Sequence, residues 1–290
     1  MPISYKLLSP EENTFSNIMI DVTHRCNMSC HNCYLPNRQI PDMDKEKLLE
    51  TMERLPNRVF ARIIGAEPTM RKDLPEIISR LKKQGHRVSL TTNGLKLADK
   101  NYLQELKSAG LRLVLLSMNG ADEDDVYMAI DNMKCAALKM KALENLIDLN
   151  MIVNTGTIIS KGCNEKTLTR QIQIFESYKL KVPPVLRFRT IGLIGRNQGS
   201  EHVYGYQEFI DFICKELDIS QSYISENKVD VLNNTSGISF AYKNVIVRLV
   251  DWTPNHDGVP DAGNDRRGRV TENWMIAPFF EHVKDNEFAY

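Results

Sequence analysis

The sequence lacks long hydrophobic runs, an excess of either charge and a high cysteine content. Its 290 residues include 37 basic and 37 acidic side chains, so the formal net charge is zero. This balance gives no sign of an electrostatic grip on nucleic acid or on an anionic membrane. No segment is long and apolar enough to act as a signal peptide or to span a bilayer. We therefore expect a cytoplasmic protein that binds neither nucleic acid nor membrane.

Six cysteines in so long a chain are too few for a secreted disulfide scaffold. Three of them, Cys26, Cys30 and Cys33, follow one another with C-x3-C-x2-C spacing. In a reducing compartment this density indicates metal binding. Three thiolates on one loop can bind three irons of a cubane iron–sulfur cluster and leave the fourth iron open. Zinc held together with His24 or His31, and free thiols, are the alternatives.

Apolar, β-branched runs alternate with amphipathic segments between about residues 16 and 217. Strands are expected at 18–22, 58–65, 87–92, 112–118, 152–160 and 185–191. Helices are expected at 44–55, 74–84, 99–109, 133–149, 165–178 and 206–217. This alternation is typical of parallel βαβ units in an α/β protein. It leaves open whether the sheet closes into a six-stranded partial barrel or stays open and doubly wound.

The pattern changes after about residue 218. Residues 238–242 and 245–251 have the character of an antiparallel strand pair, and a polar stretch rich in Gly, Pro, Asn and Asp follows. We therefore divide the chain into a core, residues 1–217, and a small α+β appendage, residues 218–290, expected to cover the substrate. Arg266 and Arg267 could meet a phosphate or carboxylate there, or the stretch could be a solvated loop.

Two motifs occupy equivalent places after neighbouring strands. The cysteine triplet follows the first expected strand, and the segment Gly65-Ala66-Glu67-Pro68-Thr69 follows the second. Together they resemble the radical S-adenosylmethionine (SAM) superfamily, which has this cysteine spacing and a Gly-Gly-Glu-Pro segment. The resemblance implies a partial (β/α)6 barrel with active-site groups at the carboxyl ends of its strands. It also implies a [4Fe–4S] cluster on the three cysteines, SAM as second cofactor, and an external electron donor such as flavodoxin or ferredoxin.

The resemblance also assigns residues to the polar groups of SAM. Gly65, Ala66 and Glu67 are expected at its amino group. Ser117 and Asn119, after the fourth strand, are candidates for the ribose hydroxyls, or form an ordinary turn. Asn154 and Arg187 are candidates for the SAM carboxylate, because a guanidinium offers paired donors. Arg187 could equally pair with an acid on a neighbouring strand.

The adenine contact departs from the family pattern. The residue before the third cysteine is usually aromatic, but here it is Asn32, and Tyr34 follows the triplet. Tyr34 and the backbone at Ile191 are therefore the candidates for adenine. Ala66 stands where the family usually has a second glycine, which adds a single methyl group.

One further cysteine has a candidate catalytic role. Cys163 follows the fifth expected strand, near the barrel mouth. It could donate a hydrogen atom to a product radical, as in some epimerase-type members of the superfamily, or be an ordinary loop cysteine. No cysteine follows Cys214, so we expect no auxiliary cluster in the C-terminal region.

The expected function is reductive cleavage of SAM to a 5′-deoxyadenosyl radical that takes hydrogen from a small polar metabolite, such as a nucleoside or sugar derivative. An alternative is a radical SAM maturase that modifies a ribosomal peptide, against which the missing auxiliary cysteines count. A third possibility is a zinc-binding or electron-transfer module without catalysis. The sequence does not distinguish oxidoreductase, lyase and isomerase outcomes.

Overall fold

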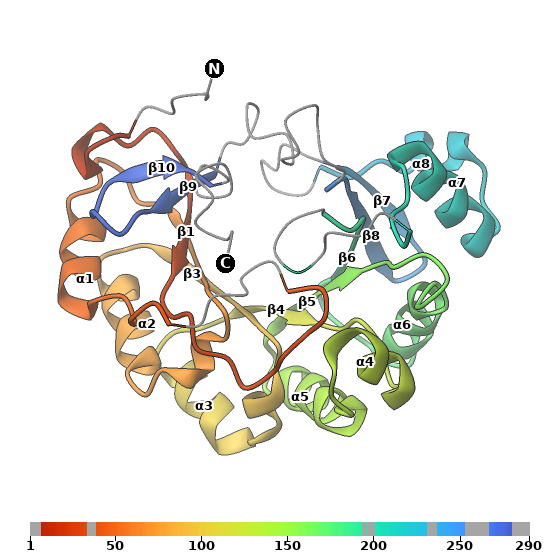
Figure 1. The fold of residues 1–290 in the computed structure, drawn as a ribbon, viewed down its shortest axis with the longest axis horizontal. Helices are drawn as coiled ribbons and strands as arrows, with labels where there is room; N and C mark the ends of the chain where they lie inside the picture. The colour runs from red at the N-terminus through yellow and green to blue at the C-terminus, as the bar shows by residue number, and fades with distance from the viewer. Residues whose placement is uncertain are drawn as a thin grey trace.

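The computed structural model describes residues 7–33, 39–192, 196, 201–230, 237–252 and 267–279. Within these residues ten strands form one sheet, in the order β10-β9-β1-β2-β3-β4-β5-β6-β8-β7. Six consecutive parallel strands make its centre: β1 (Asn17–Asp21), β2 (Phe60–Ile64), β3 (Arg87–Thr92), β4 (Leu113–Ser117), β5 (Ile152–Ile158) and β6 (Val185–Arg189). The sheet curves into an arc with helices outside it (Figure 1). The expected partial (β/α)6 barrel is therefore confirmed.

Helices fill the connections between the strands. They are α1 (Lys45–Glu53), α2 (Leu74–Lys83), α3 (Lys100–Ser108), α4 (Asp124–Asp131), α5 (Ala136–Asp148), α6 (Thr167–Glu176), α7 (Tyr206–Leu217) and α8 (Gln221–Glu226), with 3-10 turns at Pro10–Glu12, Pro68–Met70 and Leu95–Ala98. Aspartates cap the N-termini of two helices. The Asp44 side chain accepts from the Lys47 N–H before α1, and the Asp99 side chain accepts from the Asn101 and Tyr102 N–H groups before α3. These caps satisfy backbone donors that a helix leaves open. None of the described helices combines the length and apolarity that crossing a membrane requires.

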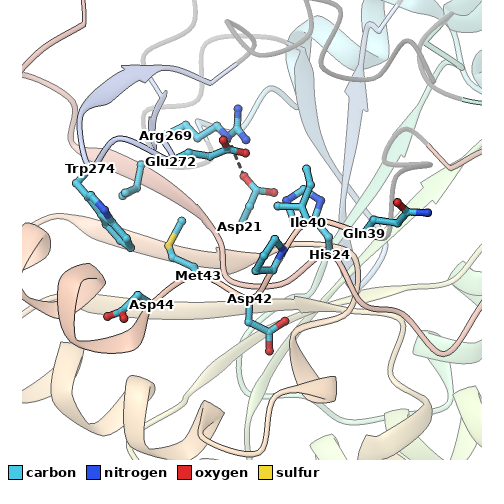
Figure 2. A pocket seen from close by; sticks show the side chains of 12 residues that line it. Asp21, His24, Gln39, Ile40, Asp42, Met43, Asp44, Arg269, Glu272 and Trp274 are labelled. Carbon is cyan, nitrogen blue, oxygen red and sulfur yellow. Dashed lines mark hydrogen bonds and ion pairs between the residues drawn. The ribbon is translucent and has the colours of Figure 1, made fainter.

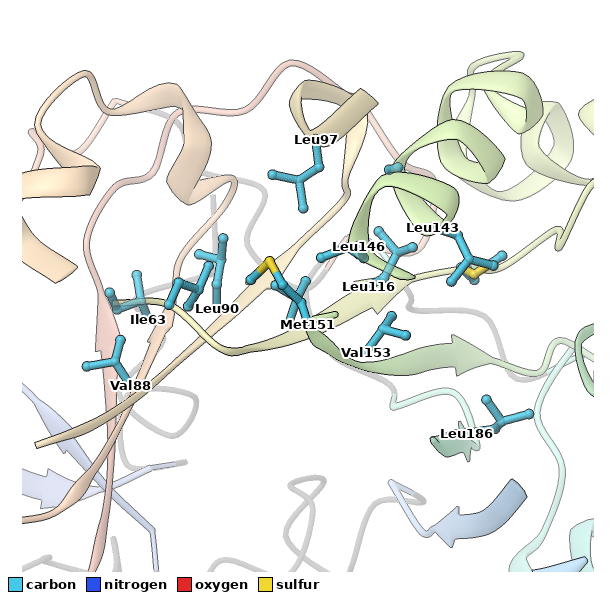
Figure 3. Packing of buried hydrophobic residues seen from close by; sticks show 14 of the residues in the cluster. Ile63, Val88, Leu90, Leu97, Leu116, Leu143, Leu146, Met151, Val153 and Leu186 are labelled. Carbon is cyan, nitrogen blue, oxygen red and sulfur yellow. The ribbon is translucent and has the colours of Figure 1, made fainter. Parts of the chain in front are cut away.

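The hydrophobic core lies between the outer face of the sheet and the helices. Leu116 and Leu186 on the strands are completely buried, and Leu143 and Leu146 of α5 pack in the same cluster (Figure 3). Because side chains alternate along a strand, the residues between these apolar positions point into the barrel. Burying each leucine contributes roughly 1.5–3 kcal/mol. The core thus stabilises the curved sheet from its outer face, and polar groups can occupy its inner face.

The C-terminal strands continue the barrel sheet at both of its ends. β7 (Ile238–Tyr242) and β8 (Val245–Val250) form the expected antiparallel pair, and β8 lies parallel to β6. β9 (Arg267–Val270) lies parallel to β1, and β10 (Ile276–Pro278) pairs antiparallel with β9. The division at residue 217 stays a prediction, but the segments on its two sides share one sheet.

The structure contains a helix, α4, that was not predicted before the expected helix at 133–149. The prediction of a single helical stretch at 133–149 missed α4 and included the break that precedes α5. Asn132 ends α4 with a left-handed φ of 53°, a conformation that asparagine tolerates. The chain enters α5 at Ala136, whose N–H donates to the Asp124 carboxylate at 2.8 Å. Asp124 of α4 therefore binds the first residue of the next helix.

Candidate active site

The carboxyl ends of the barrel strands surround a pocket that contains the cysteine triplet. Eight residues predicted from the sequence line it together: Cys26, Cys30, Cys33, Gly65, Ala66, Ser117, Asn119 and Arg187. They come from the loop after β1, the turn after β2, the end of β4 and the middle of β6. Residues far apart in the sequence thus meet because parallel strands end at one side of the barrel.

The three cysteines are reduced and partly buried. The Met28 N–H donates to Cys26 Sγ at 3.4 Å, and Asn93 Nδ2 lies 4.0 Å from the same sulfur. Burial raises the pKa of Cys30 well above the usual range, and the nearby Asp131 carboxylate adds to this. Binding of a metal centre to this thiol would therefore release its proton.

Neither histidine near the triplet lines the pocket that contains the thiols. No group of three His, Cys, Asp or Glu side chains in the described part of the chain is arranged around one metal position. His24 lines a different pocket, and the His31 side chain is exposed. A cubane cluster differs from zinc in that each thiolate binds a different iron. Three thiols at one pocket wall fit that donor set.

Backbone pairing fixes the cysteine loop against the turn after β2. The Ala66 N–H donates to Thr23 O at 2.8 Å, and the Glu67 N–H donates to Arg25 O at 3.0 Å. Gly65 adopts φ 142°, and a Cβ there would lie 2.5 Å from Thr23 O. Glycine is therefore required at the point where the two motifs touch. The Gly65–Ala66 segment contributes to the pocket through its backbone.

The Glu67 side chain does not line the pocket but accepts hydrogen bonds from neighbouring residues. It is completely buried and is not among the residues that line the pocket. Its Oε1 accepts from the Thr69 N–H at 3.1 Å, Thr69 Oγ1 at 2.6 Å and Thr92 Oγ1 at 2.7 Å, while Oε2 accepts from the Asn93 N–H at 2.7 Å. The carboxylate thus joins the end of β2 to the end of β3, and Gly65 and Ala66 are the pocket-facing part of the motif.

Asn119 lines the pocket and also holds neighbouring elements. Its Nδ2 donates to Asp131 Oδ1 at 2.8 Å, and its Oδ1 accepts from the Ile158 N–H at 3.0 Å. Asp131 is 2% exposed and lines the pocket as well. Its Oδ2 is buried and has no hydrogen-bond partner among the described residues. Asp131 was not predicted from the sequence, because a lone acid at the end of a helix carries no motif signal.

Three further predicted residues, Asn154, Ile191 and Cys163, do not line this pocket, and Arg266 lies outside the described residues. The Asn154 side chain accepts from the Val185 N–H at 2.9 Å and lines a smaller hollow deeper in the barrel, shared with Arg187. Ile191 is 4% exposed and lies outside the lining. Cys163 sits on the loop after β5, also outside the lining, and burial raises the pKa of its thiol. Tyr34 lies outside the described residues.

The lining of the pocket also combines arginines with aromatic rings. The Arg189 guanidinium lies 4.1 Å from the centre of the Trp252 ring, and that of Arg267 lies 4.8 Å from the Phe279 ring. All four residues line the same pocket as the cysteines. Arg189 and Phe279 were not foreseen. The alternation of Arg187 and Arg189 on one strand was the signal that could have identified Arg189.

A second pocket lies between the loop after β1 and β9 (Figure 2). Its floor holds an ion pair between Asp21 Oδ2 and Arg269 Nε, 3.0 Å apart, with side chains 5% and 8% exposed. His24, Met43 and Trp274 line its sides. The pair binds the end of β1 to a strand from the other end of the chain.

Curated relatives catalyse reactions on small molecules according to their names. The 7,8-dihydro-6-hydroxymethylpterin dimethyltransferase of Methanocaldococcus jannaschii is 29% identical over 204 residues, which are 67% of this chain and 40% of the relative. The GTP 3′,8-cyclase of Staphylococcus carnosus is 29% identical over 221 residues, 70% of this chain and 62% of the relative. That of Aquifex aeolicus is 28% identical over 291 residues, 92% and 89% of the two chains. The chain thus spans less than two thirds of the first two relatives.

Solved structures share the fold at low sequence identity. SuiB of Streptococcus suis bound to its precursor peptide SuiA superposes with a TM-score of 0.64 at 12% identity, covering 94% of this chain and 61% of SuiB. The protein anSMEcpe with bound AdoMet and the Cp18Cys peptide gives 0.54 at 17% identity, with 72% and 60% covered. The family model of the radical SAM superfamily matches residues 20–170, more than half of the chain. The chain therefore belongs to the radical SAM superfamily, whose enzymes use a [4Fe–4S] cluster and SAM.

Proposed function

We propose that this enzyme reductively cleaves SAM and abstracts a hydrogen atom from a small polar metabolite, nucleoside-like or sugar-like. The cluster and SAM, when bound, supply a 5′-deoxyadenosyl radical. The observation that carries the proposal is the meeting of three thiols, the Gly65–Ala66 turn and the end of β4 in one pocket. An external donor such as flavodoxin or ferredoxin would provide the electron, in the cytoplasm.

Different residues of this chain bind the cluster and the separate groups of SAM. Cys26, Cys30 and Cys33 hold the cluster, and the close approach of Gly65 to Thr23 keeps their loop in register with β2. The backbone of Gly65 and Ala66 receives the amino group of SAM. Ser117 and Asn119, at the end of β4, receive the ribose hydroxyls.

Other residues bind the carboxylate and adenine groups of SAM. Arg187 binds the carboxylate, because its buried Nε has no hydrogen-bond partner among the described residues. Asn154 supports it from the deeper hollow that both residues line. Tyr34 and the backbone at Ile191 bind adenine. Cys163 remains the candidate hydrogen donor.

The substrate class draws support from two directions. GTP and 7,8-dihydro-6-hydroxymethylpterin, which occur in the names of the relatives, are both small polar heterocyclic molecules. Trp252, Arg267 and Phe279, from the C-terminal part of the chain, line the pocket that contains the cysteines. These three side chains support the proposal that residues 218–290 cover the substrate. Peptide modification is the second candidate, and the resemblance to SuiB concerns the fold alone.

The decisive experiment follows deuterium from a substrate into 5′-deoxyadenosine. Anaerobically reconstituted protein should contain about four irons and four sulfides and should form 5′-deoxyadenosine when reduced with SAM. Cys30→Ala should abolish both the cluster and the product, whereas Cys214→Ala should leave them intact. One zinc per chain, or 5′-deoxyadenosine formation by Cys30→Ala, would overturn the proposal. Deuterium transfer from a cognate peptide, and from no small metabolite, would favour the maturase.

A further inference from the structure

The loop that carries Cys30 lies against the end of α4. The His31 N–H donates to Ile130 O at 2.9 Å, and the neighbours of these two residues, Cys30 and Asp131, both line the pocket that contains the cysteines. Burial, followed by the charge of the Asp131 carboxylate, raises the pKa of the Cys30 thiol. The end of α4 therefore places a negative charge beside one of the expected cluster ligands.

The Asp131 side chain is held in place by a neutral group. It is 2% exposed, and its Oδ1 accepts from Asn119 Nδ2 at 2.8 Å. The Asn119 amide is itself oriented, because its Oδ1 accepts from the Ile158 N–H at 3.0 Å. The other carboxylate oxygen of Asp131 has no hydrogen-bond partner among the described residues. An amide fixes the carboxylate without neutralising it, and burial leaves its charge weakly screened by water and salt.

A buried lysine acts on the same cysteine in the opposite sense. Lys139 of α5 is completely buried; its Nζ donates to Ser117 O at 2.8 Å and lies 5.2 Å from the centre of the Tyr127 ring. Its charge lowers the pKa of the Cys30 thiol, but less than the Asp131 carboxylate raises it. Tyr127, Cys135 and Cys30 belong to one small apolar cluster behind the cysteine loop. Both charges therefore act on Cys30 through surroundings of low polarity.

Fixed charges next to a ligand change the potential of an iron–sulfur cluster. A negative charge disfavours the added electron and lowers the potential, whereas a positive charge raises it. We propose that Asp131 acts through Cys30 to lower the reduction potential of the [4Fe–4S] cluster, and that Lys139 partly opposes it. A lower potential increases the driving force for passing the electron, which the external donor supplies, to the sulfonium of SAM. The inference rests on the proposed function only in placing the cluster on the three cysteines.

The test is a redox titration of the anaerobically reconstituted protein without SAM, followed by electron paramagnetic resonance. Asp131→Asn keeps an oxygen that can accept from Asn119 and removes the charge. We expect it to favour cluster reduction roughly tenfold, which makes the midpoint potential about 59 mV more positive for a one-electron couple. Lys139→Met should shift the potential in the negative direction, by a smaller amount. Loosened packing that exposed the cluster to solvent would not produce shifts of opposite sign in the two variants.

Asp125→Asn is the matched control, because it makes the same change on the same helix at a side chain that is 97% exposed. Its potential should equal that of the wild type. Should Asp131→Asn fail to fold, Asp131→Ser removes the same charge and should also raise the potential; should Lys139→Met fail to fold, the aspartate variants decide.

The inference is overturned if a variant that lacks the Asp131 charge keeps the wild-type potential, or if Asp125→Asn shifts it as far. It is also overturned if Lys139→Met shifts the potential in the same direction as Asp131→Asn. A reconstituted wild type without a four-iron cluster would overturn the proposed function and this inference with it, whereas an intact cluster with an unmoved potential would overturn the inference alone.

Discussion

Asp21 and Arg269 form a buried ion pair between side chains 248 residues apart in the sequence. It joins the end of β1 to β9 (Figure 2). Removing one partner of a buried pair leaves the other charge uncompensated, so we expect Asp21→Asn to lower the free energy of unfolding by about 3 kcal/mol. Urea unfolding of the two proteins measures the difference. Asp148→Asn is the control, because the Lys100–Asp148 pair has side chains 53% and 56% exposed and should contribute little to stability. Equal losses in both variants would contradict the structural role of the buried pair.

Glu67→Gln tests whether this carboxylate holds the strand ends together. Glutamine has one acceptor oxygen in place of two, and its NH2 group would face a backbone or hydroxyl donor. Because hydrogen bonds to charged groups contribute about 1.5–3 kcal/mol each, we expect a loss of at least about 2 kcal/mol in unfolding experiments. Glu76→Gln, at a half-exposed position on α2, is the matched control. Full stability combined with lost SAM binding would show instead that Glu67 acts on the cofactor.

His86 should make the stability depend on pH. It is completely buried; its Nδ1 accepts from the Val59 N–H at 3.2 Å, and its Nε2 lies 3.1 Å from Met52 O. Burial lowers its pKa below the usual 6.5, so the unfolded chain binds this proton first. The contribution of neutral His86 is complete above about pH 7 and is lost as the pH falls toward the folded-state pKa, with a slope of at most about 1.4 kcal/mol per pH unit.

Unfolding titrations between pH 5 and 8 measure this slope. His86→Gln keeps one acceptor and one donor without the titrating ring, so its stability should vary less over this range. His202→Gln removes an exposed histidine and should retain the wild-type slope. An unchanged slope in His86→Gln would assign the pH dependence to other groups.

Cys163→Ala distinguishes a hydrogen donor from a loop residue. Because a hydrogen donor acts after 5′-deoxyadenosine has formed, we expect the variant to make 5′-deoxyadenosine within about twofold of the wild type but to lose product; an unchanged product yield would identify an ordinary loop residue. Product formed in D2O provides the sharper measurement. A variant that still makes 5′-deoxyadenosine but no longer incorporates solvent deuterium into the product would establish Cys163 as the donor.

Local patterns predicted the six barrel strands and most of the helices between them. The expected strand at 87–92 and helix at 206–217 have the bounds of β3 and α7, because apolar periodicity is strong in both segments. The cysteine and Gly65–Ala66 motifs meet as expected, because they follow adjacent parallel strands.

Structural features that depend on residues distant in the sequence could not be predicted from local sequence patterns. The donors that turn Glu67 away from the pocket come from Thr92 and Asn93 on the next strand. Asp131 is the last residue of α4, which ends at Asn132, and this helix end was not predicted from the sequence. β9 was not foreseen beside β1, since that pairing depends on closure of the whole arc.

The placement of β9 bears on how the chain folds during synthesis. β1 leaves the ribosome well before its outer hydrogen-bonding neighbour β9, because 248 residues separate Asp21 from Arg269. Until then its unpaired edge can recruit other nascent chains. Premature termination before β9 would leave that edge bare, so we expect such products to aggregate and to depend on chaperones, rather than persist as shortened enzymes.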